Sequence, residues 1–261
     1  TFARRALPSN IKMLESLLVS DPQNETLLAL LAESYYSYAF GYLELDLAKA
    51  RAGTASEEHI DELTDRTVDH YMRARNYGFR LLDRPKLKRA ATQYDVEKVE
   101  SLLKDVGKSE IAGLFWAGYG WGSAINLAQQ NPDMVAAVPV VEAMMRRVEE
   151  LDPTYYQSGV HMFFGVSYAS RPPMAGGDPA EAKKHFEAAM KNHGKQNLMI
   201  PALYGRYYGV QTQNRAFFDR MMKRVLEADL SEHPDNRLMN ELAQRRAEFW
   251  KGRADELFVD G

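Results

Sequence analysis

Three glycines at alternate positions are the first candidates for chemistry in this sequence. Gly118, Gly120 and Gly122 lie in the segment FWAGYGWGSAI, and glycine-rich turns can cradle a phosphate with backbone N–H groups. Such a turn follows a buried strand and opens a helix, and a Walker loop also carries a Lys-Ser/Thr pair. Here the preceding residues follow a helical pattern, and Ser123 has no lysine beside it. We therefore do not expect a nucleotide site.

On a helix, the same glycines belong to a stripe of small residues. Gly113, Ala117, Gly120, Ala124 and Ala128 recur at spacings of three or four residues. A glycine inside a helix costs about 1 kcal/mol relative to alanine, so some other interaction must offset it. Close packing against a second helix is one interpretation, and space for a ligand or channel is the other.

Aromatic side chains flank this stripe and gather in other segments, including a dense group of tyrosines early in the chain. A tyrosine ring can be buried while its hydroxyl keeps a polar partner, which suits a partly wet groove. Core packing is the simpler interpretation, and the sequence leaves both open. The candidates for lining a cavity or binding a ligand are Tyr35, Tyr38, Trp116, Gly120, Trp121, Phe164 and Tyr204.

No set of residues predicts catalysis or a metal site. The chain has no cysteine, which excludes disulfides, zinc–thiolate sites and thiol nucleophiles. Six histidines are scattered, and although Glu181 and His185 share a helix face, an ion pair is commoner at that spacing than a metal site. No nucleophile-elbow, zincin or kinase motif occurs. We predict a protein that is not an enzyme and has no cofactor or metal.

Composition limits the partners. The 261 residues are 45% hydrophobic and 26% charged, as in an ordinary globular protein, and the net charge of −3 does not favour nucleic-acid binding. No apolar run approaches the ~20 residues of a membrane span. The sequence begins at Thr1 rather than methionine, which is expected of a processed chain whose targeting segment has been removed.

Helical periodicity dominates, and alternating strand patterns are missing. We expect an all-α chain of about ten or eleven helices, among them one long helix over 25–51 and one over 109–131. Asp178 and Pro179 give a strong start signal for another. Pro139 should mark a first turn or a kink.

Two segments fit the tetratricopeptide pattern of paired helices. His161, Phe164, Gly165 and Tyr168 have the spacing of the first helix, and AKKHFEAA (182–189) has that of the second. Weaker copies surround this pair at spacings longer than the usual ~34 residues. We expect one domain over 1–261, built from degenerate repeats near 24–85, 109–153, 154–194 and 198–234, with a C-terminal helix over 236–251.

Four segments, taken in order, resemble one protein family more specifically than the repeat pattern does. Residues 7–44, 115–125, 146–190 and 201–229 together resemble the T component of tripartite ATP-independent periplasmic (TRAP) transporter systems. The resemblance implies a periplasmic lipoprotein with tetratricopeptide-like helices that assembles as a homotrimer and docks the periplasmic substrate-binding protein. The family's lipid-carrying N-terminal cysteine has no counterpart here. Either it lies outside this chain, where we expect the lipid anchor, or this member lacks it.

The resulting prediction is a non-enzymatic accessory protein that docks the substrate-binding protein and holds or passes a small apolar or organic-acid ligand. The loop with Arg171, Pro172, Pro173 and Met174 is the candidate docking loop, with a plain solvent loop as the alternative. The rival function is a generic tetratricopeptide module that captures a peptide in a groove. Such grooves usually present Lys, Arg and Asn to a peptide carboxylate.

Overall fold

The computed structural model describes residues 2–259. These residues form helices joined by loops, with no β-strand among them, so the all-α prediction is confirmed. The chain divides into two compact units, one ending at Asp152 and the other beginning at Pro153. This boundary lies one residue before the limit that we expected between the second and third repeats. The single domain over 1–261, its repeats and their tetratricopeptide-like character stay predictions.

The predicted number of helices was too small. In the described residues the α-helices run from α1 to α15 instead of reaching ten or eleven. Two of the additional helices, α5 (Pro85–Thr92) and α8 (Pro132–Ala136), begin at a proline. Proline at the first helical position has the right φ and needs no N–H partner, so it starts a new helix where we expected only the end of the previous one.

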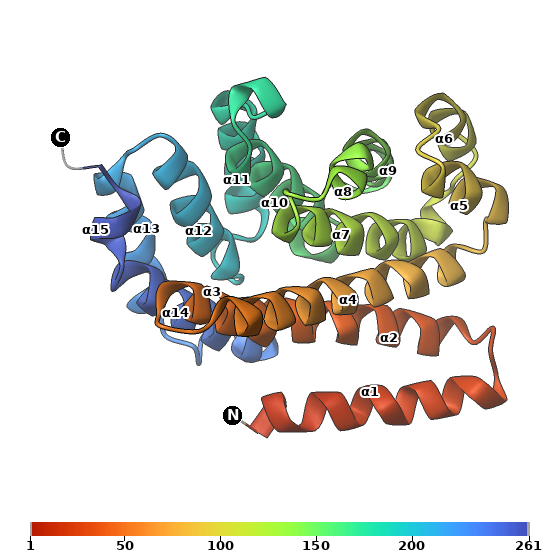
Figure 1. Ribbon diagram of the computed structural model, residues 1–261, viewed down its shortest axis with the longest axis horizontal. Helices are drawn as coiled ribbons and strands as arrows, with labels where there is room; N and C mark the ends of the chain where they lie inside the picture. The colour runs from red at the N-terminus through yellow and green to blue at the C-terminus, as the bar shows by residue number, and fades with distance from the viewer. Residues whose placement is uncertain (1, 260–261) are drawn as a thin grey trace. The chain divides into compact units, whose positions relative to one another are not determined.

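The N-terminal unit is a series of long helices laid side by side. Figure 1 shows α1, α2, α4 and α7 as successive neighbours, and α9 packs on α7. Its helices, besides α5 and α8, are α1 (Phe2–Ser20), α2 (Glu25–Tyr38), α3 (Glu44–Ala52), α4 (Glu57–Leu82), α6 (Val96–Leu103), α7 (Ile111–Leu127) and α9 (Val138–Leu151). Pro139 lies in the first turn of α9, one of the two positions expected for it.

A π-helical segment interrupts the long helix that we predicted over 25–51. Residues Ala39–Leu43 are wound as a π-helix between α2 and α3. A second π-helical segment, Tyr204–Gly209, follows α12 in the other unit. Each contains glycine and tyrosine, and hydrophobic periodicity does not distinguish such a loosened turn from an α-helical one.

Glycine allows α4 and α7 to pack with their backbones in contact. A Cβ at Gly78 would fall on the backbone of Ala117, and one at Gly113 would lie 2.7 Å from Leu82 Cα. A Cβ at Gly120 would lie 2.8 Å from the carbonyl oxygen of Tyr71. The small-residue stripe therefore packs against another helix, as one of our two interpretations held.

The C-terminal unit is built around the pair α10 and α11. Asp178 caps α11 by accepting from the N–H groups of Ala180 and Glu181, as predicted. Gly165 on α10 leaves room for the ring of Phe186, which a Cβ would approach to 2.9 Å. The helices of this unit are α10 (Tyr155–Ser170), α11 (Pro179–His193), α12 (Met199–Leu203), α13 (Arg215–Leu226), α14 (Arg237–Lys251) and α15 (Ala254–Leu257).

A left-handed turn opens α10. Tyr156, Gln157 and Ser158 have φ of 47°, 53° and 63°, so right-handed winding begins only after Ser158. Left-handed conformation costs roughly 1–2 kcal/mol for each such residue. Specific bonds hold the turn: Gln157 Nε2 donates to Asn236 Oδ1 at 2.7 Å, and Ser158 Oγ lies 2.9 Å from His193 Nδ1.

The packing of α4 on α7 predicts different effects for two glycines of the same helix. Gly120→Ala should lower the free energy of unfolding by about 1–3 kcal/mol, because the methyl group meets backbone that cannot move aside. Gly118→Ala should change it by less than about 1 kcal/mol, because its Cβ meets the flexible side chain of Met145. Urea denaturation of both variants measures the difference, and equal stabilities would contradict this account of the interface.

Candidate functional site

The predicted aromatic residues of α7 lie inside the N-terminal unit. Trp116 is 3% exposed, and its ring centroid lies 5.6 Å from that of Tyr36 on α2. Trp121 is 2% exposed and lies 6.2 Å from the Phe79 ring on α4. Between them, Gly120 contacts α4. All three residues pack between helices, and their role in binding a ligand stays a prediction.

The two tyrosines of α2 differ in their partners. The hydroxyl of Tyr35 donates to Glu15 Oε1 at 2.6 Å, and Tyr77 donates to the same oxygen at 3.1 Å. Burial opposes the ionisation of Glu15, but these bonds and one from Lys12 outweigh it and hold the pKa of Glu15 below its ordinary value. Tyr38 instead packs on His70, with centroids 5.6 Å apart.

The two aromatic candidates of the C-terminal unit lie in its core. Phe164 is fully buried, and its centroid is 4.9 Å from that of His185. Tyr204 stacks on Phe186 at 4.9 Å, and burial raises the pKa of its phenol. Like the others, they pack between helices.

The structure brings together two histidines that the sequence left scattered. His161 on α10 and His185 on α11 are both buried, and their Nδ1 atoms lie 3.1 Å apart. One Nδ1 donates the proton of this hydrogen bond and the other accepts it. The sequence could have indicated this pairing, because the two histidines fall in the two helices of the expected hairpin.

The predicted docking loop holds one apolar side chain in water. Met174 is 94% exposed. The backbone beneath it is fixed, because Gly177 N–H donates to the Pro172 carbonyl at 3.1 Å and Gly176 takes a left-handed conformation with φ of 83°. The Arg171 side chain bonds back to Ser167 through Nε and Nη2, both at 3.0 Å. The loop is therefore ordered by its own bonds.

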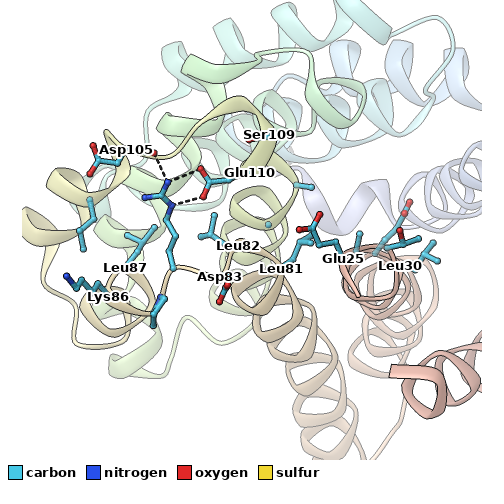
Figure 2. A pocket seen from close by; sticks show the side chains of 18 residues that line it. Glu25, Leu30, Leu81, Leu82, Asp83, Lys86, Leu87, Asp105, Ser109 and Glu110 are labelled. Carbon is cyan, nitrogen blue, oxygen red and sulfur yellow. Dashed lines mark hydrogen bonds and ion pairs between the residues drawn. The ribbon is translucent and has the colours of Figure 1, made fainter. Parts of the chain in front are cut away.

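A pocket of about 1120 Å³ opens among α2, α4, α5 and α7, away from every residue predicted as a site. Figure 2 shows Glu25 and Leu30 on one wall, with Lys86 and Leu87 on the opposite one. The lining residues are Glu25, Thr26, Ala29, Leu30, Glu33, Leu81, Leu82, Asp83, Arg84, Pro85, Lys86, Leu87, Leu102, Asp105, Ser109, Glu110, Ala112 and Gly113.

One ion pair fixes a corner of this pocket. Arg84 donates to both carboxylate oxygens of Glu110, at 2.6 and 2.9 Å, and to the carbonyl of Asp105 at 2.7 Å, drawn as dashed lines in Figure 2. Glu110 also accepts from Gly107 N–H at 3.0 Å. The hydrogen bond from Arg84 holds the pKa of Glu110 below its ordinary value. The pair joins the start of α5 to the start of α7.

Comparison with known proteins decides the family. The sequence matches the TRAP transporter T-component family over residues 1–258. The chain belongs to this family. An uncharacterized protein of Treponema pallidum (strain Nichols) is 24% identical to this T-component over 259 residues, which are 98% of this chain and 79% of the relative.

Membership makes this T-component an accessory protein of a TRAP transporter system, as the resemblance implied. Within residues 2–259, no helix is both long and apolar enough to cross a membrane.

The Arg84–Glu110 pair predicts a pH-dependent stability. Glu110→Gln should lower the free energy of unfolding by about 1 kcal/mol at pH 7, a value kept small because solvent reaches both side chains. Because folding lowers the pKa of Glu110 from 4.5, the stabilisation is present above that value and disappears as the pH falls through the lower pKa of the folded state.

Urea denaturation at pH 7 and pH 3 checks this, with Glu100→Gln on the exposed side of α6 as the matched control. A difference between wild type and Glu110→Gln that persists undiminished at pH 3 would argue against the pair as its source.

Proposed function

We propose that this T-component docks the periplasmic substrate-binding protein of its TRAP transporter through the loop that carries Met174. The observation that supports this is an almost fully exposed methionine on an ordered loop. Methionine and arginine are enriched in protein interfaces, and Arg171 lies at the base of the same loop.

The energetics favour such a contact. Burying a methionine side chain against a partner stabilises a complex by about 1.5–3 kcal/mol. The loop is already ordered by its bonds to Pro172 and Ser167, so docking does not have to offset the entropy of fixing its backbone.

The remaining features of the proposal come from the family. The protein acts in the periplasm, held to the membrane by a lipid anchor outside this chain, and assembles as a homotrimer. Its role is non-enzymatic, and it holds or passes a small apolar or organic-acid ligand for the transporter. Membership in the T-component family supports each of these statements.

A generic tetratricopeptide module that captures peptides is the weaker alternative. Peptide capture of that kind relies on cations that bind the terminal carboxylate. The pocket in Figure 2 instead has more carboxylates than cations, and the guanidinium of Arg84 is bound to Glu110.

Substitution of the exposed methionine tests docking. Met174→Asp should weaken binding of the periplasmic substrate-binding protein of the same TRAP transporter at least about tenfold, because a charge replaces the apolar contact. Met13→Asp is the matched control, since Met13 is also exposed, at 58%, but lies on α1. Isothermal titration calorimetry of both variants gives the answer, and unchanged affinity for Met174→Asp would exclude this loop.

The oligomeric state is tested separately. Light scattering at micromolar concentration should give a mass about three times that of the 29.7 kDa chain. A monomer under these conditions would remove the trimer from the proposal and leave docking open to its own test.

A further inference from the structure

One arginine in the N-terminal unit is half-buried without a carboxylate. Arg75 on α4 lies over the ring of Trp121, with its guanidinium carbon 4.7 Å from the ring centroid. Since Trp121 is almost completely buried, the ring forms a floor beneath the cation. A cation over an aromatic face is favourable but does not neutralise the charge.

The hydrogen bonds of Arg75 leave most of its donors unused. Nε and Nη2 donate to Asn76 Oδ1 at 3.2 and 3.0 Å. In the described part of the chain, no protein acceptor receives the other N–H groups of this guanidinium, and no carboxylate lies within 4.0 Å of it. By contrast, Arg73 on the same helix pairs with Asp69 at 2.8 Å.

The surroundings of Arg75 disfavour its charge. Burial lowers its pKa, and the opposing effect comes from the phenol of Tyr94 rather than from a carboxylate. A partly buried guanidinium without a counterion is costly, and an anion from solution would remove that cost.

Tyr94 is held beside this cation by an unusual backbone. Its φ is 58°, the left-handed region that favours glycine. Its N–H donates to the Ala91 carbonyl at 3.1 Å, which fixes the turn between α5 and α6. Its ring centroid lies 6.5 Å from that of Trp121, and the residue is 39% exposed. A strained residue held in place in this way is typical of binding sites.

The adjacent carboxylate does not fill the position of a counterion. Asp95 accepts from Lys98 N–H at 3.0 Å and so caps α6. Arg75 and Tyr94 thus both pack against the Trp121 ring, each carries hydrogen-bond donors, and Tyr94 reaches solvent.

We propose that Arg75 and Tyr94 bind the carboxylate of a small organic acid. The planar fork of a guanidinium matches the two oxygens of a carboxylate, and the Tyr94 hydroxyl adds a third donor. A single positive charge matches a monocarboxylate better than a doubly charged phosphate. The proposal rests on the organic-acid part of the proposed function, and it is independent of docking and trimer formation.

The test uses the chain alone, without its partner protein, so its outcome is separate from that of docking. Acetate, pyruvate and benzoate are titrated at constant ionic strength while tryptophan fluorescence is followed, with sodium phosphate as the inorganic anion. We expect at least one carboxylate to give a saturable change that phosphate does not give. No saturable change with any of the three, or an equal response to phosphate, would overturn the proposal.

Variants assign the response to the proposed donors. Arg75→Gln should weaken the responding carboxylate at least about tenfold, as expected for the loss of a charge-assisted hydrogen bond. Arg66→Gln removes the same charge from an exposed position of α4 and should leave binding unchanged. Tyr94→Phe should weaken binding about threefold or more and keeps the test available if Arg75→Gln does not fold. Wild-type affinity in Arg75→Gln or in Tyr94→Phe would contradict the assignment.

Discussion

The contact between the backbones of α4 and α7 is the constraint on which the N-terminal unit depends. Gly78, Gly113 and Gly120 remove the side chains that would hold these helices apart. Once α7 lies this close to α4, the tryptophans on either side of its stripe must pack against neighbouring helices: Trp116 contacts α2, and Trp121 lies under α4. The close packing of α4 and α7 thus organises the aromatic core and places the Trp121 ring beneath the Arg75 guanidinium.

Two partly buried carboxylates of this unit are stabilised by local hydrogen bonds. Glu15 is shared by two tyrosine hydroxyls, and Glu110 receives a guanidinium together with a backbone N–H. Each arrangement lowers the pKa of the carboxylate and so favours its charged form. Arg75 differs because the groups around it are aromatic or neutral. Arg75 thus differs from Glu15 and Glu110, whose charges are met by hydrogen-bond donors from this unit.

Local signals in the sequence predicted local structure well. Asp178 and Pro179 located the start of α11, and the small-residue spacing identified the helix face that packs closely. The two π-helical segments were not predicted, because hydrophobic periodicity is nearly the same in α- and π-helices. The site was harder to predict. Prolines and glycines marked the loop that exposes Met174, whereas the juxtaposition of Arg75 with Trp121, and the pocket of Figure 2, depend on tertiary packing between segments far apart in sequence.

The left-handed turn at the start of α10 and the α4–α7 interface should tolerate substitution of glycine differently. At Gly78 or Gly120 the backbone is ordinary helix and a Cβ would meet the backbone of the facing helix, so every substitution there should cost stability. At Gln157 the opposite holds: glycine relieves the backbone but gives up the bond to Asn236. Related sequences can therefore exchange glycine and polar residues at this turn with little net change in stability, whereas the same exchange at the helix interface lowers stability.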